Sequence, residues 1–387
     1  MYFGKQGRRC PYSALITEKE YHQWSAHTFV NKLFAGSVKK LVASLVSGGQ
    51  LGVLTESGAL YMWGGADGVG GELWEPCGDA IAKFIAPDGL RQVDAGRWSM
   101  VYIDADGTLW NARYGTGETV KLAGNVKMAF RDHYSGLALL EDGSVLTWGS
   151  SEYGQLGNGT REPAGEKIFI DDVPFEPIKI MDDVRSISRC GQSCFAIKED
   201  GSLWRWGLID HNDHNEAVCL TEPELFLQDV KQVSGGVRGF AIKRDGSLWA
   251  WGPSWLNEKG KAAPYFNGAP QKIMDKVRYA VSTWCFAEIK EDGSLWVWGD
   301  NWNGQLGDGT DITRHEPYKL MDNVVDAACG YGWMLIMTES GELWETGTHE
   351  GLYQFSDEDA LRASRLPHRV MEGISPEVEN DAGFIGK

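Results

Sequence analysis

Short runs of alternating apolar and polar residues recur along the chain, and a glycine turn interrupts each run. The clearest run covers residues 195–207, with Phe195, Ile197, Leu203, Trp204 and Trp206 on either side of Asp200-Gly201. Such alternation, rich in aromatic and branched residues, is typical of half-buried strands. We expect a two-residue turn with positive φ at both Asp200 and Gly201, because these residue types tolerate that conformation. The segment therefore predicts a β-hairpin.

The same hairpin pattern occurs seven times along the chain. A Leu or Val follows two residues after each turn glycine, and five copies end in Trp-Gly. The turn glycines are Gly58, Gly107, Gly143, Gly201, Gly246, Gly293 and Gly341. A single hairpin is only marginally stable. Seven copies therefore indicate a repeat architecture in which neighbouring units support one another.

Two further strand-like segments fall between the copies. One opens at Val184, Val230, Val277 or Val324, and the other is a Pro…Met-Asp-x-Val segment just before it, as at residues 177–184. Three or four short strands in each repeat are typical of a propeller blade. The sequence thus predicts an all-β, seven-bladed β-propeller over residues 38–374. It also predicts a leader at 1–37 that packs on the propeller and a tail at 375–387.

The end of the chain suggests how the ring closes. Residues 367–374 repeat the between-copies strand, but no further hairpin follows them. We expect this strand to complete the blade begun by the N-terminal copy, so that pairing of N- and C-terminal segments closes the propeller. Residues 29–38 are the alternative source of that strand. Closure would remove the free sheet edges of an open array.

The repeats resemble those of the regulator of chromosome condensation family. The resemblance is strongest at residues 141–160, EDGSVLTWGSSEYGQLGNGT, and at 291–310, EDGSLWVWGDNWNGQLGDGT. The resemblance covers roughly residues 38–374. The Trp-rich repeat motif is similar to that of bacterial members of the family, which include an inhibitor of β-lactamases. The resemblance implies a seven-bladed propeller. Its functional implications are broad, because the family's propellers act as nucleotide exchange factors, enzyme inhibitors or docking modules.

Charge narrows the choice of partners. The chain has 37 Lys and Arg against 54 Asp and Glu, a net charge of −17. Such a surface repels phosphate backbones, so we expect no nucleic-acid partner and leave a basic protein partner open. No apolar run approaches the ~20 residues of a membrane helix. No secretory signal is visible and the seven cysteines show no paired framework, so we expect a cytoplasmic protein.

A ring of variable loop residues is the candidate binding site. Equivalent positions of every blade lie on a ring, and positions that vary between copies are free for function. The most variable triplets lie eight to ten residues before the turn glycines, and their aromatic and Arg side chains are typical of binding hot spots. The predicted binding residues are Arg97, Trp98, His133, Tyr134, Gln192, Arg238, Trp284, Tyr331 and Trp333. The alternative is that these aromatic rings fill the channel walls as core.

Other candidate chemistry is weaker. His133 beside Asp132 offers one acid–base pair. The segment from Asp210 to His214 lacks a second ligand cluster, which favours a solvated loop over a zinc site. Cys190 and Cys194 are expected to be core thiols. We therefore expect no cofactor and no metal.

The sequence favours a non-catalytic binding module that holds a protein or peptide partner on its loop face. The insertions at 161–176 and 349–366 are predicted to add contact surface. The alternatives are an enzyme or small-molecule binder that uses the central channel, and a nucleotide exchange factor for a small GTPase, which rests on the family resemblance alone. Composition and spacing give no prediction of the oligomeric state.

Overall fold

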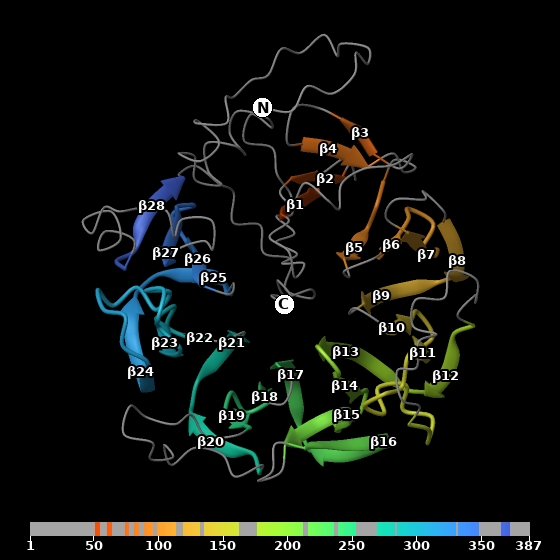
Figure 1. Cartoon of the computed structure of the whole chain (residues 1–387). Coiled ribbons are helices and arrows are strands. Elements are labelled where there is room, and N and C mark those ends of the chain that lie inside the picture. Colours follow the sequence, from red (N-terminus) through yellow and green to blue (C-terminus); the bar gives the residue numbers. More distant parts are fainter. Residues whose placement is uncertain are drawn as a thin grey trace.

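The structure is a computed structural model of the full chain (Figure 1). It describes residues 51–54, 60–63, 74–76, 81–84, 89–95, 99–113, 119–131, 135–161, 176–211, 216–235, 239–252, 269–282, 285–329, 332–347 and 365–371. Within these residues all regular elements are strands, which confirms the all-β prediction.

The described strands form seven antiparallel sheets of four strands each, arranged around a common centre (Figure 1). The first four sheets along the chain contain β1 (Leu51–Leu54), β2 (Leu60–Trp63), β4 (Ile81–Phe84) and β3 (Trp74–Pro76); β5 (Gln92–Ala95), β6 (Ser99–Ile103), β7 (Leu109–Arg113) and β8 (Thr119–Ala123); β9 (Val126–Arg131), β10 (Ser135–Leu140), β11 (Val145–Gly149) and β12 (Ile178–Met181); and β13 (Val184–Cys190), β14 (Ser193–Lys198), β15 (Leu203–His211) and β16 (Ala217–Leu227). The last three contain β17 (Val230–Gly235), β18 (Gly239–Lys243), β19 (Leu248–Trp251) and β20 (Gln271–Met274); β21 (Val277–Ser282), β22 (Cys285–Lys290), β23 (Leu295–Gly299) and β24 (Arg314–Met321); and β25 (Val324–Cys329), β26 (Trp333–Thr338), β27 (Leu343–Gly347) and β28 (His368–Met371). Seven blades were predicted, and seven are present.

Each blade from β5 onward is one continuous stretch of chain, which corrects the predicted closure. β28, which lies within the strand predicted at 367–374, pairs with β27, so it completes the last copy's blade and not the first. The reason is local: an outer strand follows its own hairpin closely enough to pair with it. In the first sheet, β1 and β2 flank the first turn glycine as β14 and β15 flank Gly201. β1, β2 and β4 thus match the second, third and outer strands of other blades, and β3 is an extra edge strand. The predicted donor at residues 29–38 lies outside the described residues.

The hairpin turns differ from the predicted type. The amide of Gly201 donates to the Lys198 carbonyl at 2.9 Å, and that of Lys198 donates to the Ser202 carbonyl at 2.9 Å. Only Gly201 has a positive φ, 90°, whereas Asp200 does not. This is a type I turn followed by a left-handed glycine, the usual three-residue hairpin loop. Asp200 instead accepts hydrogen bonds from the amide and the hydroxyl of Ser202, at 2.8 and 2.7 Å.

The two ends of each blade are different surfaces. Because the strands of a blade are antiparallel, the hairpin turn lies at the same end as the link from the outer strand to the next blade. We call this end the turn face. Five of these links are only two residues long, and the second residue always has a positive φ: Asn125, Asp183, Asp229, Lys276 and Asn323. The opposite end, the loop face, carries the connections from inner to second strand and from third to outer strand.

Backbone hydrogen bonds join successive blades at the turn face. The Val184 amide donates to the carbonyl of Gly143 in the preceding hairpin turn at 3.0 Å. The carbonyl of Asp183 accepts from the amide of Glu199 in the following turn at 2.9 Å. The same pair of bonds recurs at the other four short links. The valines that open the inner strands are therefore part of the joint between blades.

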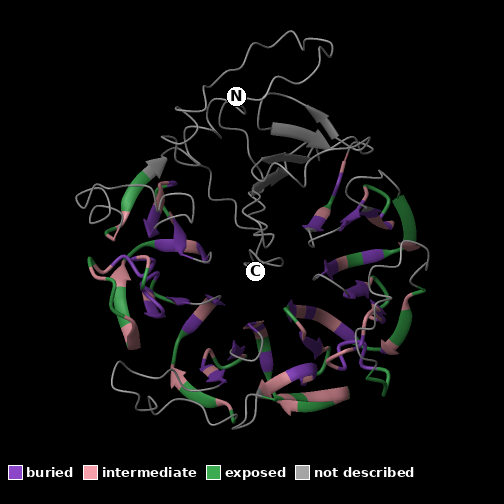
Figure 2. Ribbon diagram, viewed as in Figure 1, coloured by how far each residue is buried: buried purple, intermediate pink, exposed green. Residues whose placement is uncertain are grey.

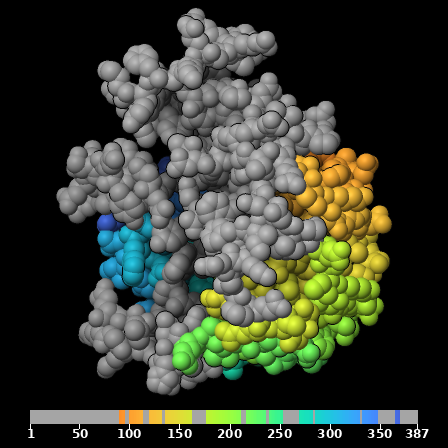
Figure 3. Space-filling model, turned by 45° about the vertical axis from the view of Figure 1, so that its right-hand side comes forward, coloured from red at the N-terminus to blue at the C-terminus, as the bar shows by residue number. Residues whose placement is uncertain are grey.

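Side chains strengthen the joints near the ring's centre. Arg278 on β21 donates Nη2 to the carbonyls of Val324 and Val325 at 2.7 and 3.1 Å, and Arg185 bonds the next blade in the same way. Apolar side chains of adjacent sheets share one core, as between β22 and β25. Burial is concentrated on the inner strands and exposure on the outer ones (Figure 2). Consecutive sheets from β5 to β28 contact each other, and Figure 3 shows the orange, yellow and green parts of the chain side by side.

Candidate interaction surface on the loop face

Most of the predicted ring lies outside the described residues, and two of its members are described. The residues outside are Arg97, Trp98, His133, Tyr134, Arg238, Trp284 and Tyr331, together with Asp132 and residues 212–215. Gln192 lies between β13 and β14 and is half-buried. Its carbonyl accepts from the amide of Leu208 at 3.1 Å. A Cβ on Gly207 would lie 2.1 Å from that carbonyl, so the glycine permits the close approach.

Trp333 belongs to the wall of its blade. It is the first residue of β26, pairs with Gly347 and is 4% exposed. The residues that begin β10, β14 and β22, which are Ser135, Ser193 and Cys285, are buried in the same way. In the five triplets whose third residue is described, that residue therefore already belongs to a strand. For Trp333 this corrects the prediction of an open contact residue and favours the alternative of a wall residue.

The Gly-Gln-Leu-Gly segment at 154–157 clamps one blade onto the next. It lies on the loop face, after β11. The carbonyl of Gln155 accepts hydrogen bonds from the indole N–H of Trp206 at 3.0 Å and from the thiol of Cys194 at 3.8 Å. Gly154 has φ of 76°, and a Cβ there would lie 2.5 Å from the carbonyl oxygen of Leu220. We call residues 150–161 with Thr221–Pro223 the first clamp.

An equivalent clamp joins the last two blades. The carbonyl of Gln305 accepts from the hydroxyl of Thr346 at 2.6 Å. The amide of Gly309 donates to the Arg365 carbonyl at 2.9 Å, as the amide of Gly159 donates to Thr221 at 2.9 Å. Residues 365–367 thus match 221–223, and both triplets end in proline. We call residues 300–314 with Arg365–Pro367 the second clamp.

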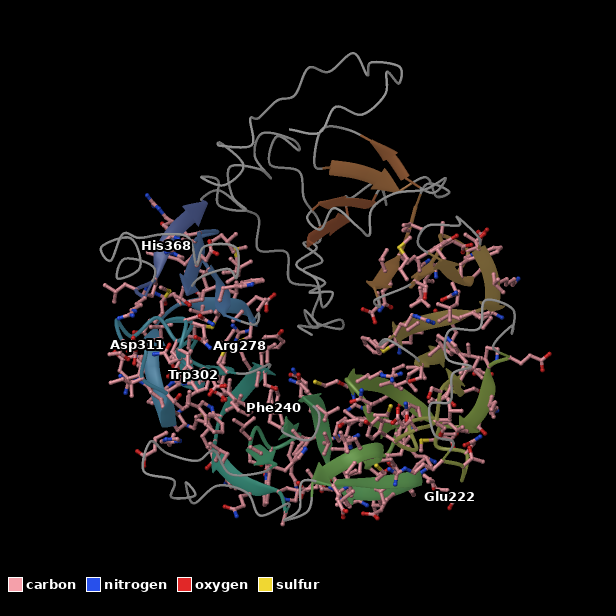
Figure 4. All side chains as sticks on the ribbon, in the orientation of Figure 1. Glu222, Phe240, Arg278, Trp302, Asp311 and His368 are labelled. Carbon is pink, nitrogen blue, oxygen red and sulfur yellow. The ribbon has the colours of Figure 1, made fainter. Side chains whose placement is uncertain are left out.

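The two clamps present different side chains to solvent. Where the first clamp has Glu152 and Glu222, the second has Trp302 and Leu366. Trp302 is 78% exposed and Leu366 54%, and Ile312 in the same clamp is 58% exposed. Arg365, next to Leu366 in the chain, forms an ion pair of 2.8 Å with Asp311, next to Ile312. Figure 4 shows Trp302 and Asp311 in the same sector of the ring, and Glu222 in another. The second clamp is therefore the apolar version of a shared scaffold.

One buried acidic group was missed by sequence reasoning. Glu288 on β22 is fully buried, and the indole N–H of Trp298 donates to its Oε1. Among the described residues its Oε2 has no hydrogen-bond partner. Burial raises the pKa of Glu288 to about 8, and the hydrogen bond from Trp298 lowers it only in part. The sequence does show that Glu288 is unusual, because the equivalent position is alanine in three other copies: Ala138, Ala196 and Ala241.

The cysteines and charged clusters give no catalytic arrangement in the described part of the chain. Cys194 is a buried core thiol as predicted, but Cys190, at the end of β13, is exposed, so that half of the prediction is wrong. A hydrogen bond with Cys285 and burial raise the pKa of Cys329 well above its ordinary value. Such a thiol stays protonated and unreactive. The described residues contain no group of three metal-ligating side chains and no helix able to span a bilayer.

Family models match two parts of the chain. The regulator of chromosome condensation (RCC1) repeat matches residues 142–197 and 292–336. These stretches contain the third and sixth hairpin turns. After the turn, each stretch also contains the Gly-Gln-Leu-Gly loop of one clamp. The penicillinase repressor model matches residues 3–54, of which the structure describes only β1.

Curated relatives match about half of the chain. An Arabidopsis thaliana mitochondrial RCC1 domain-containing protein, RUG3, is 29% identical over 198 residues, which cover 43% of this chain and 42% of that protein. The human E3 ubiquitin-protein ligase HERC2 is 25% identical over 197 residues, 44% of this chain and 4% of that protein. The chain thus matches less than half the length of either relative.

Solved structures extend the likeness to most of the described fold. Saccharomyces cerevisiae Prp20p, described with its binding to Gsp1p and histones, has a TM-score of 0.58 at 17% identity and covers 74% of this chain and 79% of its own. Human WBSCR16 has a TM-score of 0.55 at 18% identity, with 73% and 81% covered. The chain thus contains RCC1 repeats, and its fold is a β-propeller similar to those of these solved structures.

Proposed function

We propose that the protein is a non-catalytic binding module that holds a protein or peptide partner on its loop face. The contrast between the two faces carries this proposal. The turn face uses its backbone groups to join neighbouring blades, in the same way at every short link. The loop face instead varies from blade to blade and exposes a tryptophan and two aliphatic side chains. Variable loops on a rigid scaffold are the usual carriers of binding function.

Two solved structures of one yeast propeller support a protein partner. Prp20p, the yeast RCC1, binds Gsp1p and histones, and a second structure shows it with Kap60. These partners are those of the yeast protein. At 17% identity, the likeness shows a shared fold and does not identify the partner of this chain. For this chain, the net charge of −17 favours a basic partner, because opposite charge speeds association and selects against acidic competitors.

Co-purification from the native host, with one variant for each face, tests the proposal. The loop-face variant is Trp98→Ala with Trp284→Ala, both in the predicted ring. The turn-face control is Lys272→Ser with Lys319→Ser, which removes exposed ion pairs to Asp275 and Asp322, each 2.7 Å long. We expect the loop-face variant to lose the captured partner while its melting temperature stays unchanged, and the control to retain it. Equal loss in both variants, or unfolding of the loop-face variant, would contradict the proposal.

Two other functions stay open as predictions. A central-channel enzyme would depend on His133 and Asp132, so His133→Ala would abolish turnover without affecting partner capture. Nucleotide exchange rests on the family resemblance alone, and stimulated nucleotide release from a small GTPase would show it.

A further inference from the structure

We infer that the second clamp is a docking surface for a protein segment that places a cationic side chain next to an apolar one. The surface consists of Trp302, Ile312 and Leu366, with Asp311 beside them. This inference rests on the proposed protein-binding role, and it names a different part of the loop face from the ring of variable triplets.

The exposed apolar groups are mostly in solvent in the described fold. Burying a side chain such as leucine is worth roughly 1.5–3 kcal/mol, so large apolar groups left in water are available to a partner. A tryptophan that is 78% exposed contributes little to its own core. The first clamp shows that the scaffold does not need these groups, because it holds its blades with Glu152 and Glu222 at the equivalent positions. Trp302 and Leu366 are therefore free for contact.

The backbone that carries these side chains is held firmly. The Asn301 amide group donates to the Thr310 carbonyl and to Asp308 Oδ1, each at 3.0 Å, and closes the loop between Trp302 and Ile312. Leu366 follows Arg365, whose carbonyl accepts from Gly309. Its side chain lies against Gly309, 3.4 Å from where a Cβ would stand. A pre-organised surface loses little conformational entropy on binding.

Charge around the clamp selects the partner's chemistry. The second clamp contains Asp300, Asp308 and Asp311 against Arg314 and Arg365, a net charge of −3 + 2 = −1, and Glu316 follows just after it. Asp308 is engaged by Arg314, while the Asp311 side chain is 49% exposed beside Arg365. A Lys or Arg of the partner can lie over the Trp302 ring, which attracts cations, while an apolar neighbour contacts Ile312 and Leu366. The net charge of −17 for the whole chain disfavours an acidic ligand.

The test uses the residues of the first clamp as substitutions. Trp302→Glu with Leu366→Glu gives the second clamp the side chains that the first carries, so the fold should tolerate them. The probe is a synthetic peptide of alternating Arg and Leu, and binding is measured by calorimetry on the full chain. We expect the double variant to bind at least about tenfold more weakly, the size of a modest hot spot. Charge attraction alone would predict the opposite, because the variant is more acidic.

Three controls separate the outcomes. Glu152→Gln with Glu222→Gln should bind the peptide as the wild type does. A Glu-Leu peptide and an Arg-Ser peptide should both bind weakly, since each lacks one half of the chemistry. Unchanged or tighter binding of the Arg-Leu peptide by the Trp302→Glu, Leu366→Glu variant would overturn the inference, as would Trp302-dependent binding to lipid vesicles without peptide binding. If the Trp98→Ala, Trp284→Ala variant loses the native partner and the Trp302→Glu, Leu366→Glu variant retains it, the proposed function stands. The second clamp is then not the docking surface.

Discussion

The indole N–H of Trp298 donates to a carboxylate oxygen of Glu288, and both side chains are buried in the sixth blade. The contact is closed to solvent, so the carboxyl group is held mainly in its neutral form until the pH approaches about 8. Its pKa is higher in the folded chain than the ordinary value of 4.5. The native state therefore binds the proton more tightly than the unfolded state does.

Glu288 is expected to make stability fall as pH rises. The contribution of Glu288 to the free energy of unfolding is complete below the pKa of the unfolded state. It is lost as pH rises toward about 8. Each unit of pKa difference corresponds to about 1.4 kcal/mol. Denaturant unfolding from about pH 5 to about pH 9 should show the wild type losing stability relative to Glu288→Gln. Asp326, whose pKa burial raises to about 6, is present in both proteins and cancels from the difference. A difference that does not vary with pH would contradict this account.

Gly154→Ala is expected to destabilise the first clamp by about 2 kcal/mol or more. Its φ of 76° is unfavourable for alanine, and the new Cβ would lie 2.5 Å from the Leu220 carbonyl oxygen. Gly191→Ala is the matched control, because its φ is 56° with nothing within 4 Å of the added carbon. Comparison of the two unfolding free energies isolates the steric part. If the two variants were equally destabilised, the close approach at Gly154 would have no energetic role.

Lys276→Asn is expected to stabilise the fold by several tenths of a kcal/mol. Lys276 has φ of 61° in the link between β20 and β21. The other four short links place Asn or Asp at this position, and those residues tolerate the left-handed region better than lysine. Thermal unfolding should show a small rise in melting temperature. Asp229→Asn, already a favourable residue type at the same position, is the control and should change little.

The repeat pattern predicted the blades because each strand pair depends on local alternation and a local glycine. Turn geometry was predicted wrongly, since Asp200 bonds Ser202 and leaves the left-handed position to Gly201 alone. The closing strand was assigned to the wrong blade, because a strand pattern does not show which neighbour it pairs with. β28 pairs with the hairpin nearest to it in the chain.

The candidate site was harder to predict than the fold. A residue's place in a variable triplet did not reveal that Trp333 begins a strand and is buried. The clamps could have been found by aligning the two Gly-Gln-Leu-Gly copies, where Trp302 stands opposite Glu152. That alignment gives the difference in side chain, but the exposure of Trp302 depends on how the loop folds onto the next blade.

The recurring bond from the amide that opens each inner strand to the preceding turn glycine has a consequence for how such a chain can grow. Because the five short links share this bond, a segment cut from one link to the next has matching ends. Duplication or deletion of such a segment would change the ring by one whole blade. The turn-face bonds between the remaining blades would stay the same. On the loop face, segments outside the two clamps can lengthen or change sequence without altering these turn-face bonds.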